Sequence, residues 1–508
     1  MSQRTAIGLL LASICGLLFL GFVTVERDPP WGPLGNPAGF STDEGWYTKG
    51  AQVLEREGRF TRPLDFSAFT HNPLHSALLA AAMRVFGAGL GVVRAVSLVL
   101  SSLGLVALYL LARRAVSSAT ALLVALACAA SFLHFTYSRT AQPYAVALAF
   151  SLAALAAWAH SRSIASLAAG IAFAALGALF KASFLFTPAA LGLLAAADGA
   201  KDLREGRGRT CAVRLGLAAA GVATVCAVYV VLSRCAPDSF ATYQGHALDE
   251  MVGRHVPRTA LALLVNEELT FWYFLSLRTR SPVLAIAAGV GLLVAIYRRE
   301  WRAPRRPTVA VLVWLALGLL PLGLTTFRPY RFFYFAVPAL AYLAVVATEG
   351  VSGKRRHALL AGAIVLLHLA HQAPMYAQWL SRSRPESQAD AARDVVRQIL
   401  RDRARATLIG RTSAYVAIFD RRVRAIELDW LGLDGEHAFC DRLARYRPDH
   451  LLRFERDLAD LPARCPALVE RLQAVARYDI MENAAPKYGP AQLHRIVYLR
   501  EARQAPLP

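Results

Sequence analysis

The stretch "VVRAVSLVLSSLGLVALYLLARR", residues 92–114, is a long apolar run with one arginine near its start and two at its end. A helix that crosses a membrane needs about 17–25 predominantly apolar residues. Cytoplasmic loops of membrane proteins are enriched in lysine and arginine. The run therefore predicts a transmembrane helix over residues 92–112 whose C-terminal end faces the cytoplasm.

Similar runs recur along the chain, which is 56% hydrophobic and only 18% charged. Soluble domains are less apolar, so this composition indicates a membrane protein. The first run follows a single arginine and lacks a small-residue cleavage site, so we interpret it as an uncleaved helix. Eleven spans are predicted, near residues 5–25, 92–112, 117–136, 141–160, 164–180, 183–198, 211–232, 282–297, 308–323, 332–348 and 357–374.

The charged loops orient these spans. Residues 73–86 are short and carry His75 and Arg84, so they are interpreted as a helix on the membrane surface. With that choice every second loop is basic, as cytoplasmic loops are. The N-terminus is then inside, and three segments lie outside the membrane: a first loop over about 26–91, a middle loop over about 233–281, and the C-terminal tail.

The net charge of +21 would favour a nucleic-acid partner in a soluble protein. Here the basic residues cluster between apolar runs, so membrane topology explains them and no nucleic-acid partner is expected. The seven cysteines include no CxxC pair and no Cys/His cluster with zinc spacing. Cys440 and Cys465 could form a disulfide if the tail is extracytoplasmic.

The chain divides into a transmembrane domain over 1–380 and a charged tail over 384–508. The tail begins with "SQADAARDVVRQILRDRA", residues 387–404, whose apolar positions recur at helical spacing. Short strands are predicted further on, at "ATLIG", "VRAIEL", "HLLRF" and "HRIVYL". A small extracytoplasmic α/β domain is therefore expected after the helical membrane domain.

Two adjacent acids open the first outer loop, in "FSTDEGWYTKG", residues 40–50. One interpretation is a capping box, in which Ser41 caps the start of a helix and the Glu44 side chain reaches back to the Ser41 backbone. In this interpretation Asp43 lies in the first turn, where a negative charge interacts favourably with the helix dipole. The other is catalysis, because the predicted topology puts both acids beside the outer membrane surface. The sequence leaves both interpretations open.

Four basic residues stand at outer ends of spans: Arg139, Lys181, Arg328 and Arg331. Such residues often only extend to water or join an interfacial belt, here with Tyr330. Guanidinium and ammonium groups also bind phosphate. An acid that faces bases beside a membrane suits sugar transfer from a lipid phosphate, with the carboxylate as general base.

An ordered set of motifs supports this chemistry. After the first span come "DE..Y", "HNPL", the arginine-led span at 92–114, "SRTAQPY", "ALFKASFLF" and "RPYRFFYFAVP". Over roughly residues 5–375 this order resembles the C-type glycosyltransferases, in particular the group with the protein O-mannosyltransferases and the lipid A aminoarabinose transferases. The resemblance implies a polyprenyl-phosphate sugar donor, a multi-pass inner-membrane enzyme with an outward active site, and inversion at the anomeric carbon.

The resemblance also implies residue roles. Asp43 matches the catalytic base, with Glu44 beside it, and His71 opens the helix of the "HPPL"-like motif. Lys181, Arg328 and Arg331 match basic residues near the donor phosphate, and Arg139 is added as a possible compensating cation. Gln142 stands where relatives have an acid, so it is expected to contact the acceptor or the sugar, as are His71 and Tyr330.

The missing acid at Gln142 argues against a divalent metal there, because hard cations prefer carboxylate oxygens. No cofactor is expected besides the lipid-linked sugar substrate, although a metal requirement stays open. Two other functions also stay open: a flippase for a lipid-linked sugar, and a non-catalytic membrane scaffold. The sequence identifies neither the sugar nor the acceptor.

Overall fold

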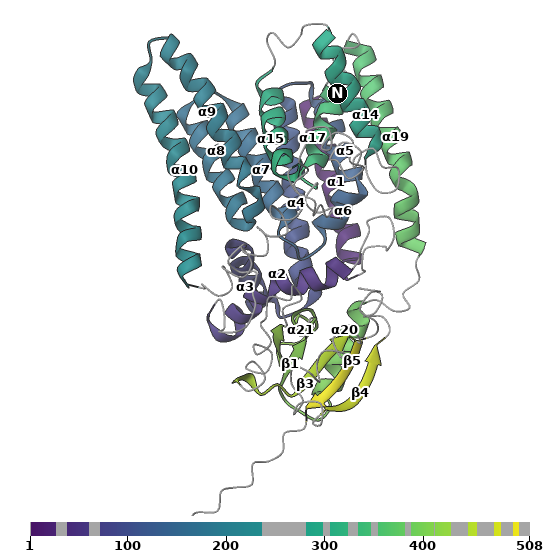
Figure 1. Cartoon of the computed structure of the whole chain (residues 1–508). Helices are drawn as coiled ribbons and strands as arrows, with labels where there is room; N and C mark the ends of the chain where they lie inside the picture. Colours follow the sequence, from purple (N-terminus) through teal and green to yellow (C-terminus); the bar gives the residue numbers. More distant parts are fainter. Residues whose placement is uncertain are drawn as a thin grey trace, which may run out of the picture.

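The computed structural model describes residues 2–26, 38–59, 72–235, 281–297, 305–323, 334–346, 354–381, 388–410, 412–427, 445–454, 472–478 and 491–496. Apolar helices form a bundle, and a β-sheet lies beyond one end of it (Figure 1). The chain crosses from bundle to sheet between helix α19 and helix α20. The predicted disulfide between Cys440 and Cys465 lies outside the described residues.

A helix occurs at each predicted span. These helices are α1 (Gln3–Val23), α4 (Leu90–Arg113), α5 (Ser118–Ala130) with α6 (Phe132–Ser138), α7 (Tyr144–His160), α8 (Ile164–Phe180), α9 (Phe186–Arg204), α10 (Gly208–Cys235), α14 (Pro282–Tyr297), α15 (Arg306–Gly323), α17 (Ala336–Val346) and α19 (Lys354–Ser381). In the part of the chain described, five helices are long and apolar enough to cross a membrane, or up to six if α5 and α6 form one span. The multi-pass membrane fold is thereby supported, and the count of eleven stays a prediction.

The predicted span at 117–136 is broken by a bend of 70° between α5 and α6. Ser131 adopts an extended conformation at the break. The backbone N–H of Phe132, which the break removes from the helical ladder, donates instead to the side-chain oxygen of Gln372 at 2.8 Å. The bend thus depends on α19, because a buried backbone donor needs a partner.

Two helices lie at the end of the bundle nearest the sheet, α2 (Ala38–Glu57) and α3 (Pro73–Phe86) (Figure 1). Proline at the first position of α3 suits a helix start, because its missing N–H would have no helical partner. The buried side of α3 includes His75, Ser76 and Leu79, and the helix packs against α2, α4 and α8.

The capping box predicted at Ser41 is wrong. Helix α2 begins at Ala38, so Ser41 lies inside the first turns and does not precede them. The Glu44 carboxylate bonds to Arg94 and to the backbone of Ala141, which lie far along the chain. A tertiary partner therefore replaces the local one that the sequence pattern predicted.

The tail contains α20 (Gln388–Leu400), α21 (Ser413–Ala417) and strands β1 (Ala406–Gly410), β2 (Val423–Glu427), β3 (His450–Phe454), β4 (Leu472–Tyr478) and β5 (Ala491–Ile496). The sheet order is β2-β1-β3-β5-β4. Strand β1 pairs in parallel with β2 and β3, whereas β5 is antiparallel to β3 and β4. Strand β4 was not predicted, and β5 begins three residues earlier than expected.

Helix α2 also docks on the tail. Arg56 donates to the backbone oxygens of Val423 and Ala417 at 2.6 and 2.7 Å, and Gln52 donates to Ala414 at 2.8 Å. Closest of all, a Cβ at Gly45 would stand 2.5 Å from the backbone N of Tyr415. Only glycine allows this approach, because the backbone of Tyr415 cannot move aside for a Cβ atom as the end of a flexible side chain could.

Replacing Gly45 with Ala is expected to destabilise the junction between α2 and the tail by about 1–3 kcal/mol, a usual cost of overpacking. Faster limited proteolysis of the tail and a lower melting temperature in detergent would show it. Gly192→Ala is the matched control, since no atom lies within 4 Å of its added Cβ. Equal behaviour of the two variants would contradict the close packing.

Candidate active site

A buried ion pair joins α2 to α4 at the sheet end of the bundle. The guanidinium of Arg94 donates to both oxygens of Glu44, from Nε at 2.8 Å and from Nη2 at 2.6 Å. The two side chains are 1% and 0% exposed. Arg94 also donates to the backbone oxygen of Val25, just after α1, at 2.9 Å. This planar, two-pronged geometry fixes orientation more firmly than a single contact does.

The turn between α6 and α7 joins the same network. The backbone N–H of Ala141 donates to Glu44 Oε1 at 2.6 Å, so that oxygen accepts two hydrogen bonds. The carbonyl of Ala141 lies 3.0 Å from Nε2 of His75 on α3. Ala141 therefore connects α2 to α3, Glu44 extends the network to α4 through Arg94, and the Glu44 carboxylate is occupied by structural contacts.

His75 is fully buried, and burial lowers the pKa of its imidazole to about 4, with a smaller contribution from the charge of Lys181. The hydrogen bond to the Ala141 carbonyl acts in the opposite direction. A carbonyl only accepts, so Nε2 carries the proton and donates it. The ring is thus a neutral donor near neutral pH.

Lys181 follows α8 and is 3% exposed. Its ammonium donates to the Tyr47 hydroxyl at 3.0 Å, and that hydroxyl lies 3.0 Å from the Tyr144 hydroxyl. The ammonium also stands 4.6 and 5.2 Å from the centres of these two rings, within cation–π range. A cation so placed can stabilise an anion strongly, because little water screens it.

Arg139 ends α6 and is also buried. It donates to the backbone oxygen and the hydroxyl of Thr24 at 2.8 and 3.0 Å, and its guanidinium lies 4.6 Å from the Trp379 ring centre. These contacts fasten the end of α1 to α6 and α19. They are contacts within the protein, and a role in phosphate binding stays a prediction.

Two buried amides carry a carbonyl with no hydrogen-bond partner among the described residues: Gln142 and Asn72. Asn72 precedes α3 and donates its amide to the backbone oxygen of Tyr47 at 3.4 Å. Leaving a buried acceptor without a donor is costly. Each carbonyl is therefore suited to accept a hydrogen bond from a sugar or acceptor hydroxyl.

Asp43 lies in α2, one residue before Glu44, and its side chain is outside the described part of the structure. The other predicted site residues for which nothing is described are His71, Arg328, Tyr330 and Arg331. The structure thus brings Glu44, Lys181, Arg139 and Gln142 to one end of the bundle. Within the described ranges, no three His, Cys, Asp or Glu side chains are grouped as metal ligands.

Three residues that make direct contacts in this network have no role predicted from the sequence: Arg94, Tyr47 and His75. Arg94 had a signal: it is a charged residue in the first turns of an apolar helix, where it needs a partner. No sequence pattern indicates a role for His75 or Tyr47, because buried histidine and tyrosine are common on apolar helix faces.

Comparison with known proteins identifies the fold. The family model of dolichyl-phosphate-mannose-protein mannosyltransferases matches residues 70–207, which include Arg94, Arg139 and Lys181. The structure is similar to ArnT from Cupriavidus metallidurans bound to undecaprenyl phosphate (TM-score 0.59, 16% identity, 97% of this chain and 98% of the other). The protein has the fold of a C-type membrane glycosyltransferase.

A second similar structure is that of the archaeal oligosaccharyltransferase AglB from Archaeoglobus fulgidus, solved in complex with an inhibitory peptide and a dolichol-phosphate. Its TM-score is 0.51 at 13% identity, over 95% of this chain and 74% of the other. Among curated protein sequences there is no match. The resemblance predicted from the ordered motifs is confirmed, and the protein is a multi-pass membrane protein of the C-type fold.

Proposed function

We propose that the protein is a glycosyltransferase that moves a sugar from a polyprenyl-phosphate donor to a lipid, glycan or protein acceptor. The reaction takes place at the extracytoplasmic face of the inner membrane and inverts the anomeric carbon. One observation carries the proposal: a buried cluster with Lys181, Arg94 and Glu44 lies beside Asp43 at one end of an apolar bundle. Two proteins of this fold were solved with a polyprenyl phosphate or a dolichol-phosphate.

In the proposed mechanism Asp43 accepts the proton of the acceptor hydroxyl as that oxygen attacks the anomeric carbon. The bond from the anomeric carbon to the phosphate oxygen breaks, and its electron pair leaves with the polyprenyl phosphate. Lys181 stabilises the charge that develops on this oxygen, together with Arg328, Arg331 and Arg139. No cofactor takes part in this scheme.

Glu44 is a positioning residue in this scheme. Its carboxylate already accepts three hydrogen bonds, two from Arg94 and one from Ala141, so it is poorly placed to receive a proton. Because Glu44 anchors α2 to α4, it fixes the backbone of its neighbour Asp43. Gln142, His71 and Tyr330 are assigned to contacts with the sugar or the acceptor.

Replacing Lys181 with Met is expected to raise the KM for the donor tenfold or more, since a hydrogen bond to a charged group contributes about 1.5–3 kcal/mol. The methionine keeps most of the buried volume, so the melting temperature in detergent should change little. Lys201→Met is the control, since Lys201 is exposed at the other end of α9. An unchanged donor KM would remove Lys181 from the phosphate site.

The function itself is tested by comparing lipid extracts of a deletion strain and its parent by mass spectrometry. A glycosyltransferase predicts a lost sugar on the product and accumulation of the lipid-linked donor. Restoration by the wild-type gene, and transfer of labelled sugar by the purified protein in detergent, complete the test. Accumulated donor in cells with no transfer by the purified protein would instead favour a flippase.

A further inference from the structure

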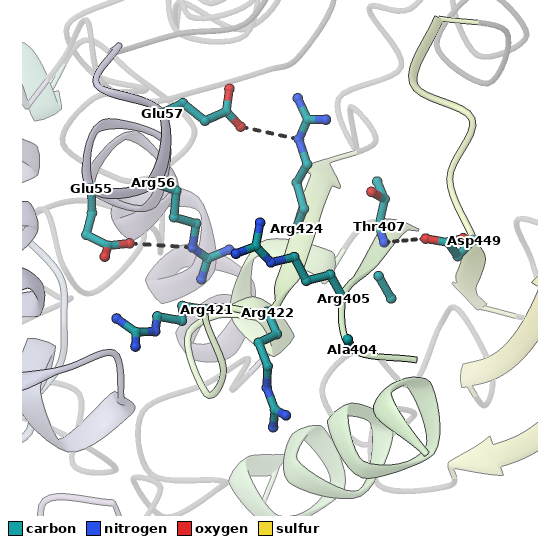
Figure 2. Close-up of a pocket in the computed structure, with 11 residues that line it drawn as sticks. Glu55, Arg56, Glu57, Ala404, Arg405, Thr407, Arg421, Arg422, Arg424 and Asp449 are labelled. Atoms are coloured by element: carbon teal, nitrogen blue, oxygen red, sulfur yellow. Dashed lines mark hydrogen bonds and ion pairs between the residues drawn. The ribbon is translucent and has the colours of Figure 1, made fainter. Parts of the chain in front are cut away.

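A pocket of about 660 Å³ lies between the end of α2 and the sheet of the tail. Its walls come from residues 55–57 of α2, residues 404–407 at the start of β1, residues 421, 422 and 424 at the start of β2, and Asp449 before β3 (Figure 2). It is separate from the buried cluster of Glu44, Arg94 and Lys181, and the proposed transfer step does not use it.

The lining is rich in arginine. Five arginines line the pocket, Arg56, Arg405, Arg421, Arg422 and Arg424, against three acids. Like charges gathered in one pocket repel one another unless anions offset them.

The acids are committed to particular partners. Glu55 lies 3.7 Å from Arg56, and Glu57 lies 3.3 Å from Arg424 (Figure 2). Asp449 accepts the backbone N–H of Thr407 at 2.7 Å and forms an ion pair with Arg403, which is outside the pocket lining.

Arg422 is also paired, because Asp420 accepts from its guanidinium at 2.7 Å. The other two lining arginines are Arg405 and Arg421. Both are exposed, and neither has a side-chain hydrogen bond or ion pair with any residue that the structure describes. Both line the same pocket, and guanidinium groups bind phosphate or carboxylate through paired donors.

The pocket and the candidate active site share one rigid element. Glu44 and Arg56 are twelve residues apart on α2, which at 1.5 Å per residue is roughly 18 Å along the helix axis. Arg56 is held to the tail by two backbone hydrogen bonds, so the spacing between pocket and site is fixed at both ends.

We propose that this pocket binds an anionic group, phosphate or carboxylate, of the acceptor, and so selects acceptors that carry such a group at a distance from the hydroxyl that receives the sugar. The assignment to the acceptor rests on the proposed glycosyltransferase function. Binding of the anion rests on the pocket alone.

Binding is tested by isothermal titration calorimetry, in which inorganic tripolyphosphate is added to the full chain in detergent. We expect saturable binding that weakens with added salt, and R405Q/R421Q should raise the Kd at least tenfold. The matched control is R397Q/R401Q, which removes the same charge outside the pocket, from α20 and from the residue that follows it, and should leave the Kd within twofold. No saturable binding, or equal loss in both double variants, would overturn the proposal.

The source of the anion is tested in lipid nanodiscs. Tripolyphosphate should bind equally well in phosphatidylcholine discs with and without phosphatidylglycerol. If phosphatidylglycerol abolishes binding, lipid head groups fill the pocket and the acceptor assignment is overturned.

The role of the pocket in acceptor binding is tested separately, in the sugar-transfer assay. In the transfer assay, R405Q/R421Q should raise the KM for the acceptor at least tenfold and leave the KM for the donor unchanged. An unchanged acceptor KM overturns the acceptor assignment. A wild-type protein that transfers no sugar contradicts the proposed function, while the binding measurement still decides whether the pocket takes an anion.

Discussion

Replacing Asp43 with Asn is expected to lower the rate of sugar transfer by a factor of roughly 10²–10⁴, the usual contribution of a general base. Asparagine keeps the size and hydrogen-bonding shape of the side chain but cannot accept the proton of the acceptor hydroxyl. The effect should appear in kcat, since the proton moves in the transition state. Initial rates with labelled donor and purified protein measure it.

The matched control is Asp390→Asn in α20, an exposed acid in a surface pair with Arg393. It removes the same charge from the tail and should leave kcat unchanged. Asp43→Glu is informative as well, because it keeps the base but lengthens it, and partial activity is expected. Full activity of Asp43→Asn in a correctly folded protein would withdraw Asp43 from the mechanism.

The sequence predicts the parts of the fold that neighbouring residues determine, but not the parts that depend on contacts between residues far apart in the chain. The positions of the apolar helices follow from long runs of composition, so each predicted span contains a helix. The bend between α5 and α6 depends on Gln372, which is 240 residues from its partner Phe132, and no local pattern indicates it. The sequence does not predict strand β4, because "LQAVARY" lacks the turn residues and the β-branched run that mark a strand.

The candidate site shows the same limit. The sequence predicts Lys181 and Gln142 as site residues, because a lysine between two apolar runs and a changed motif residue both stand out. The partner of Glu44 was not predicted, since Arg94 is 50 residues away and two hydrogen bonds join the pair only in the folded chain. The local capping pattern at Ser41 predicted a different partner for Glu44, and the tertiary ion pair prevails over it.

Replacing Glu44 with Ala is expected to destabilise the folded protein by about 3–5 kcal/mol, because it leaves a buried guanidinium without its carboxylate. The N–H of Ala141 loses its acceptor in the same variant. A lower melting temperature in detergent, and a lower yield of folded protein, measure the loss. Asp394→Ala is the control, since its pair with Arg397 is 54% and 76% exposed and such pairs contribute at most about 1 kcal/mol.

The double variant E44Q/R94M separates the cost of an isolated charge from the contribution of the pair. Glutamine keeps an acceptor for the Ala141 N–H, and methionine removes the buried positive charge. Replacing both members of a buried ion pair is often far less costly than removing one, so the double variant should be more stable than Glu44→Ala. If it is less stable than the single variant, the ion pair itself stabilises the junction of α2 and α4. If Glu44→Ala melts like the wild type, the pair is not a structural anchor, and Glu44 returns to consideration as the catalytic base.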